Sequence, residues 1–219
     1  MSAPDDLRAT IARDLPPVKP LRSPFVRALA LVPLAAAIVF AVPALHFFRS
    51  DLGALGLVRG WGFSYAQAVA GIVIVAVALR ESIPGRALSR AALWWTIAAG
   101  LVIPAVVLVL TTSTFDIGPA PGRRLMDGLG CFRASAGASL PALIVSALLA
   151  ARAFPLRPGV AGALYGLGCG LIADAGLRLY CEYSAPQHVV FAHGGAVLGA
   201  MFAGVLVAWI SAQGLGIRD

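Results

Sequence analysis

Charged residues are scarce in this chain. Its 219 residues include only 17 Lys and Arg and 10 Asp and Glu, and long stretches carry no charge. Hydrophobic residues make up 59% of the sequence, to which 24 glycines are added, whereas a soluble globular chain is about 45–50% apolar by a similar count. So few polar side chains cannot cover a surface that faces water. A soluble fold is therefore excluded, and lipid surrounds most of the chain.

Sequence motifs for catalysis are absent as well. The chain has no GxSxG, no P-loop and no GxGxxG between a strand and a helix, so we expect neither enzymatic activity nor a cofactor. The net charge of +7 is not gathered in a basic block interleaved with aromatic residues, so direct nucleic-acid binding is not indicated. In a membrane protein this excess belongs at the cytoplasmic ends of the spans.

Six uncharged runs divide the chain, and each is close to the roughly 20 residues that cross a bilayer as a helix. They predict an all-α membrane protein with six transmembrane helices joined by short loops. The runs are residues 28–48, 60–79, 91–115, 134–151, 160–177 and 189–215. The first run is longer than the apolar core of a signal peptide and lacks a clear cleavage site, so we expect it to be retained.

Basic residues predict the orientation of these helices. With the N-terminus inside, cytoplasmic segments hold eleven Lys and Arg and outer segments hold six. The positive-inside rule therefore places both termini in the cytoplasm of a bacterial inner-membrane protein.

The first 25 residues form a segment distinct from the membrane domain of residues 26–219. Leu7, Ile11 and Leu15 recur at i, i+4 and i+8 and predict a short helix with a narrow apolar stripe. Four prolines then follow between residues 16 and 24, so this second half must be extended. Such a segment suits a partner with a helix-binding groove and a second surface for an extended strand.

Thiols and imidazoles gather on the predicted outer side. Cys131 is expected in the loop before the fourth span and Cys181 directly after the fifth, with His188 and His193 at the start of the sixth. A structural disulfide between the two cysteines is one interpretation. A redox-responsive or metal-responsive pair, with Glu182, His188 and His193 as accessory ligands, is the other. Cys169, among glycines within the fifth span, is expected only to pack.

Asp174 is the one acid inside a predicted span. It precedes Arg178 by four residues, a spacing that favours a structural ion pair over a role in proton or ion movement. Glycines also recur at i+4, at positions 162, 166 and 170 and again at 195 and 199. These rows predict close packing of helices within one chain, and a homodimer contact is the alternative.

Three groups of residues resemble the NrsF (negative regulator of sigma F) family of membrane anti-sigma factors. The first is the segment Asp14-Leu15-x-Pro-Val18-Lys19-Pro20-Leu21-Arg22. The second is Cys131 followed by residues 155–162, PLRPGVAG, and the third is Cys181-Glu182 followed by Pro186, Val189, Phe191 and His193. The resemblance covers nearly the whole chain, and its specific parts are the N-terminal element and the two spaced cysteines.

The resemblance implies that the chain sequesters an extracytoplasmic-function sigma factor at the inner membrane and releases it under heavy-metal or oxidative stress. The paired outer cysteines of the family correspond to Cys131 and Cys181. We expect the sigma factor to contact the N-terminal segment, through residues Leu7, Ile11, Leu15, Val18, Lys19, Leu21 and Arg22. The alternative function is a small ion or solute transporter that uses Asp174 and the outer His/Cys cluster.

Overall fold

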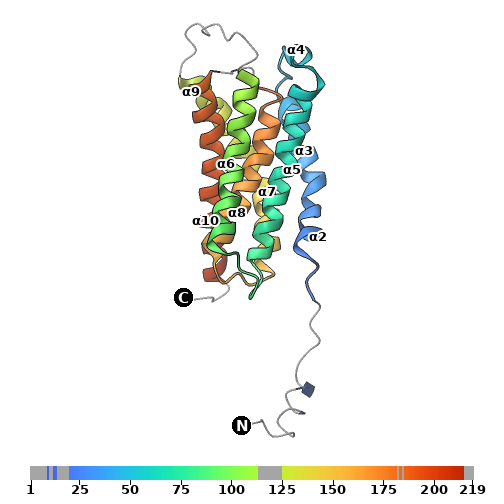
Figure 1. The fold of residues 1–219 in the computed structure, drawn as a ribbon, viewed down its shortest axis with the longest axis vertical. Coiled ribbons are helices and arrows are strands. Elements are labelled where there is room, and N and C mark those ends of the chain that lie inside the picture. The colour runs from blue at the N-terminus through green and yellow to red at the C-terminus, as the bar shows by residue number, and fades with distance from the viewer. Residues whose placement is uncertain are drawn as a thin grey trace.

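The computed structural model describes residues 9, 12–13, 20–112, 125–181, 183 and 185–214. These residues form a bundle of long helices that run side by side (Figure 1). Its elements are α2 (Pro24–Ala28), η1 (Leu29–Leu31), α3 (Val32–Leu45), α4 (Leu52–Gly56), the π-helix η2 (Leu57–Gly62), α5 (Phe63–Glu81), α6 (Arg90–Thr112), α7 (Leu125–Ala151), α8 (Pro158–Leu177), α9 (Pro186–His188), the π-helix η3 (Val189–Gly194) and α10 (Gly195–Gly214).

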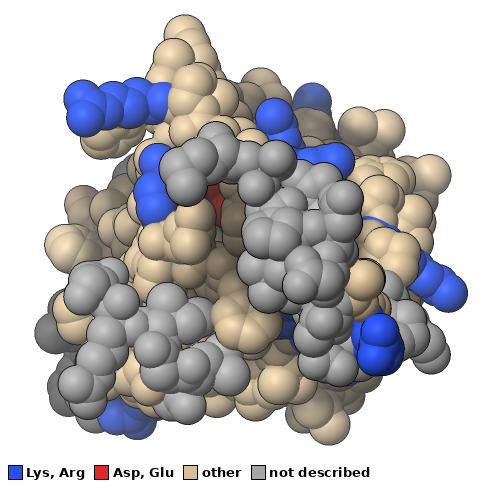
Figure 2. Space-filling model, turned by 90° about the horizontal axis from the view of Figure 1, so that it is seen from below, with Lys and Arg blue, Asp and Glu red and all other residues tan. Residues whose placement is uncertain are grey.

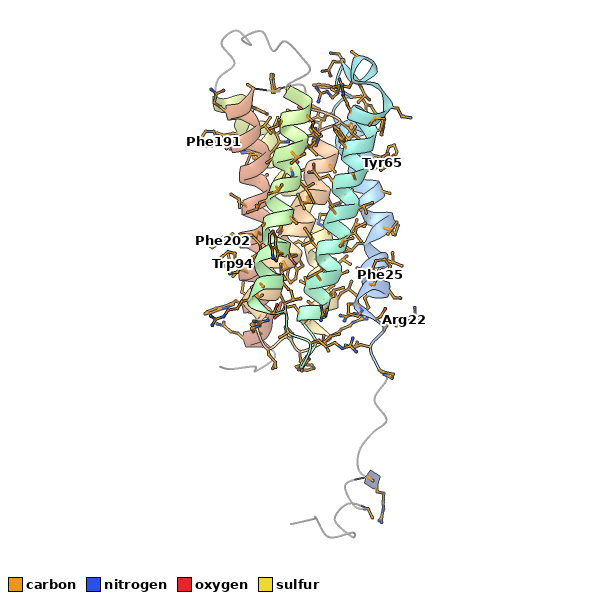
Figure 3. The ribbon with its side chains drawn as sticks, viewed as in Figure 1. Arg22, Phe25, Tyr65, Trp94, Phe191 and Phe202 are labelled. Atoms are coloured by element: carbon orange, nitrogen blue, oxygen red, sulfur yellow. The ribbon has the colours of Figure 1, made fainter. Side chains whose placement is uncertain are left out.

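Six helical stretches in the described chain are long and apolar enough to cross a membrane, which confirms the predicted fold class. With an even number of spans, the start of α2 and the end of α10 lie at the same end of the bundle (Figure 1). Large aromatic side chains point outward from the bundle, among them Phe25, Tyr65, Trp94, Phe191 and Phe202 (Figure 3). A surface of this kind suits contact with lipid.

Two spans begin more than five residues earlier than the charges predicted. Helix α7 starts at Leu125, nine residues before the expected start, so Cys131 lies on a helix and the prediction of a loop was wrong. The second span likewise starts at Leu52 and includes Arg59. A charge near the end of a span marks no boundary, because a long Arg side chain such as exposed Arg133 extends from the helix surface toward the interface.

Helix α8 is the centre of the bundle: 89% of this span is buried, against 11% of the span in α6. It contacts α3, α5, α6, α7 and α10. Glycines allow this close approach, because a Cβ atom added at Gly162 or Gly166 would overlap backbone atoms of α10, and one at Gly168 would overlap α5. The predicted packing role of the glycine row in this span is thus confirmed.

The glycines at 195 and 199 pack differently from the prediction. An added Cβ at Gly195 or Gly199 would be 3.7 Å from the ring of Phe132 on α7, in ordinary contact. The close approach to α8 is instead made by Gly204, one turn beyond the predicted row. A repeat of glycines in one helix shows where its small residues lie. Where two helices approach most closely depends on the residues of both helices.

An ion pair between a buried carboxylate and a partly exposed arginine connects two segments at the end of the bundle where α2 begins. Glu81, the last residue of α5, accepts hydrogen bonds from the backbone N–H of Leu88 at 2.6 Å and from Arg157 Nε at 2.7 Å. Arg157 also donates to the Leu88 carbonyl oxygen at 3.1 Å. These bonds tie the loop after α5 to the residue that precedes α8.

Candidate functional site

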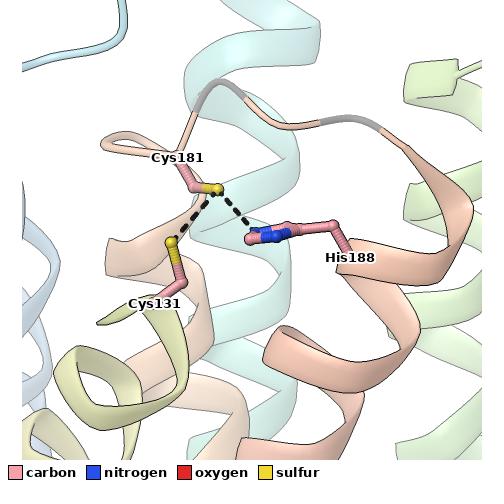
Figure 4. Close-up of side chains that lie close together, drawn as sticks. All are labelled: Cys131, Cys181 and His188. Atoms are coloured by element: carbon pink, nitrogen blue, oxygen red, sulfur yellow. Dashed lines mark hydrogen bonds between the residues drawn. The ribbon is translucent and has the colours of Figure 1, made fainter. Parts of the chain in front are cut away.

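Cys131, Cys181 and His188 meet at the opposite end of the bundle (Figure 4). The two Sγ atoms are 3.7 Å apart, and Cys181 Sγ lies 3.2 Å from His188 Nε2. One potential ligand atom from each residue lies within 4.8 Å of the other two. The three side chains come from α7, from the turn after α8 and from α9, and we call them the thiol–imidazole site.

The turn after α8 fixes Cys181 through its backbone. The N–H groups of Tyr180 and Cys181 both donate to the Leu177 carbonyl oxygen, at 3.1 and 2.7 Å. The segment after α3 also contacts this turn, because the backbone N–H of Arg49 donates to the Leu179 carbonyl oxygen at 3.0 Å. Helix α7 holds the facing thiol, so the distance between the two cysteines depends on how α7 and α8 pack.

Both thiols of the site are free and buried. The hydrogen bond with Cys131, together with burial, raises the pKa of the Cys181 thiol above its usual range. Cys181 therefore holds its proton at neutral pH, and a metal ion or an oxidant has to displace it.

Aromatic rings surround the site. Tyr183 packs on His188 with ring centroids 5.0 Å apart, and His46 packs on Tyr180 at 4.8 Å. All three histidines thus lie at the end of the bundle that holds the thiols, as the sequence predicted. His46 belongs to the aromatic layer and is not one of the three grouped ligands.

His193 has a different partner from the one expected of an accessory ligand. Its Nδ1 lies 2.6 Å from Asp174 Oδ1, and the second carboxylate oxygen of Asp174 accepts a hydrogen bond from Gln67 Nε2 at 2.6 Å. The positive charge of Arg178 attracts the carboxylate of Asp174, whereas the ion pair at 2.6 Å joins Asp174 to His193. The sequence prediction did not include Gln67, although a single amide side chain within an apolar span indicates a buried hydrogen bond.

The remaining predicted site residues are placed as follows. Leu21 and Arg22 are exposed and lie just before α2. His188 belongs to the thiol–imidazole site, where its Nε2 contacts Cys181 Sγ. Cys169 is buried within α8 at 3.4 Å from Ser146 Oγ, as expected of a packing residue. Five residues of the N-terminal segment and one acid lie outside the described residues: Leu7, Ile11, Leu15, Val18, Lys19 and Glu182.

The fold and the site define a class: a six-helix membrane protein with two apposed cysteines at one end and basic residues around the other. The family model named negative regulator of sigma F, NrsF, matches residues 11–212. The chain belongs to this family, which makes it a negative regulator with a sigma factor as its partner, and its role is regulatory. No curated protein and no solved structure matches the chain.

Proposed function

We propose that this protein sequesters an extracytoplasmic-function sigma factor at the cytoplasmic face of the bacterial inner membrane. Residues 1–25 bind the partner, and heavy-metal or oxidative stress at Cys131 and Cys181 releases it. The observation that carries the proposal is the 3.7 Å distance between two thiols that lie 50 residues apart in the sequence. They lie at the end of the bundle opposite to the start of α2 (Figure 1).

The charge distribution supports this orientation. Among described residues 20–112, 125–181, 183 and 185–214, seven Arg lie at or near the end where α2 begins, at positions 22, 27, 80, 86, 90, 152 and 157. Four lie toward the other end, at positions 49, 59, 133 and 178. Figure 2 views the first end and shows Lys and Arg of the described residues around its rim. The positive-inside rule assigns this end to the cytoplasm.

The N-terminal segment is tested by removing it. The family match begins at residue 11 and so includes the whole proline-rich part, residues 16–24. We expect a chain without residues 1–19 to reach the membrane in normal amounts, measured by immunoblot, but to leave a sigma-dependent reporter active. Leu15→Asp and Lys19→Glu should each weaken repression, because they alter an apolar anchor and a charge. Full repression by the shortened chain would contradict the proposal.

The thiol–imidazole site suits two stimuli. In a tetrahedral zinc site with Zn–S bonds of about 2.3 Å, two sulfurs are about 3.8 Å apart, close to the observed 3.7 Å between the Cys131 and Cys181 sulfurs. Two thiolates and an imidazole are ligands that soft divalent ions prefer. The same two thiols are close enough to form a disulfide after a small movement, with loss of two protons and two electrons to an oxidant.

Cysteine variants separate the sensing proposal from structure. Cys131→Ser and Cys181→Ser should each abolish release of the sigma factor by Cd²⁺ and by the thiol oxidant diamide, while basal repression persists. Cys169→Ser is the matched control, since this thiol is buried elsewhere, and it should respond normally. A normal response in both site variants would refute the sensing role.

His188 distinguishes the two stimuli. Its imidazole is a metal ligand but takes no part in disulfide formation, so His188→Ala should reduce the response to Cd²⁺ and preserve the response to diamide. Loss of the diamide response, with the cysteines still present, would mean that His188 acts by positioning Cys181 and would argue against a metal-ligand role.

A further inference from the structure

A cavity of about 200 Å³ lies beside the thiol–imidazole site, between α6, α8, η3 and α10. Its walls are mostly apolar, with Leu101 and Pro104 from α6 and Val197 and Leu198 from α10. The polar residues that line it are Asp174, Arg178 and His193. The described bundle thus contains a space large enough for a small molecule beside a buried carboxylate–imidazole pair.

The cavity opens toward lipid. Three of its lining residues, Leu101, Val190 and Leu198, are also exposed on the outside of the bundle, by 39, 59 and 48%. They lie on α6, η3 and α10, in spans that are apolar enough to cross the membrane. A ligand would therefore enter sideways from the bilayer, so it has to be lipid-soluble.

One polar atom of the pair is unpartnered. His193 is only 5% exposed, and its Nε2 has no hydrogen-bond partner among the residues that the structure describes. Its Nδ1 is held by Asp174, so in the neutral imidazole Nδ1 carries the hydrogen and Nε2 is an acceptor. A buried acceptor without a partner costs about 1–3 kcal/mol. A ligand hydroxyl that donates to Nε2 would satisfy it.

We propose that this cavity binds the ring of a lipid-soluble quinol, with one ring hydroxyl donating to His193 Nε2. An apolar cavity of about 150 Å³ holds benzene, so a space of about 200 Å³ holds a ring with small substituents. The alkyl tail of the quinol remains in the lipid through the opening beside Leu198. This site goes beyond sigma-factor regulation and is independent of the proposed thiol chemistry.

Binding is tested with the full chain in lipid nanodiscs and a decyl-tailed dimethoxy-methyl-benzoquinol as the probe, measured by calorimetry against empty nanodiscs. We expect saturable binding of one molecule per chain. His193→Phe should weaken it at least tenfold by removing the acceptor. Ala105→Phe should abolish it, because Ala105 lines the cavity and a larger side chain there fills it.

Val106→Phe is the matched control. Val106 neighbours Ala105 on the same helix and is 47% exposed, but it does not line the cavity. This variant should bind the quinol as the wild type does, and equal thermal unfolding of the two α6 variants keeps the comparison independent of folding. Unchanged binding in Ala105→Phe, equal loss in both α6 variants, or displacement of the quinol by equimolar 1-decanol would overturn the proposal.

Discussion

The crossing of α5 and α8 depends on two glycines that face each other. A Cβ atom added at Gly168 would lie 2.5 Å from the carbonyl oxygen of Gly71, and one added at Gly71 would lie 2.5 Å from the carbonyl oxygen of Gly168. At Gly168 the added atom would also be 2.8 Å from a methyl group of Val75. Gly168→Ala and Gly71→Ala therefore each force one methyl group into a contact between two backbones.

The size of the effect follows from these distances. A carbon atom beside a carbonyl oxygen needs about 3.3 Å, so the helices must separate by about 0.8 Å at the crossing. Overpacking of this kind costs about 1–3 kcal/mol. Alanine recovers about 0.5–1 kcal/mol relative to glycine within a helix. We expect each variant to lose about 1–2 kcal/mol of stability overall.

Equilibrium unfolding in mixed detergent micelles measures this loss. Gly137→Ala on α7 is the matched control, because an added Cβ there meets nothing within 4 Å, and it should be neutral or stabilising. The double variant of Gly71 and Gly168 should lose less than the sum of the single losses, since one separation of the helices relieves both overlaps. If Gly168→Ala is as stable as Gly137→Ala, the described approach of α5 to α8 is wrong.

Three further changes test other contacts. Glu81→Gln should destabilise the protein by about 1–3 kcal/mol, because two hydrogen bonds, one of them buried, lose a charged acceptor. A cycle with Arg157→Met should show that the two losses do not add. Tyr165→Phe should cost about 0.5–1.5 kcal/mol, since its buried hydroxyl donates to an α10 carbonyl oxygen at 3.0 Å. The hydrogen bond from Arg49 lowers the pKa of Asp51. The bond between Arg49 and the Asp51 carboxylate therefore stabilises the fold fully above about pH 4, near the pKa of Asp51 in the unfolded chain. This stabilisation is lost as the pH falls through the lower pKa of Asp51 in the folded protein. Unfolding midpoints between pH 2 and 6 should show this slope in the wild type and not in Asp51→Asn, and the slope should be small because Asp51 is about one third exposed.

Hydropathy and charge were sufficient to place six helices, because lipid leaves the backbone few alternatives to a helix and charges are expelled from its interior. The errors occurred where one Arg near a helix end was taken as a boundary. Arg27 is the clearest case: it lies inside the first span, buried, and donates to the Leu149 carbonyl oxygen. An arginine can lie within a membrane span when its guanidinium donates a hydrogen bond to a neighbouring helix. The sequence of α2 alone does not show which helix that neighbour is.

The sites were predicted less completely, because they depend on several helices at once. Sequence position placed Cys131, Cys181 and His188 at one end of the bundle, but their grouping depends on how α7, α8 and α9 pack. Asp174 shows the limit of local reasoning. The spacing along α8 brings the charge of Arg178 near it, but the hydrogen bonds to its carboxylate come from His193 and Gln67 on other helices.

Helix α8 connects the two ends of the molecule that the proposed function requires to communicate. Cys181 follows its last turn, and Arg157, paired with Glu81, precedes its first. Between them, glycines bring α8 into close contact with α5 and α10, so α8 is packed tightly along its length. A movement of Cys181 on metal binding or oxidation would therefore be transmitted along α8 as a displacement of the whole helix, and the Glu81–Arg157 pair is where that displacement meets the loop after α5. This pair is positioned to couple the thiols to the basic end, because it is a discrete contact that can break, whereas the packed helices can only move together.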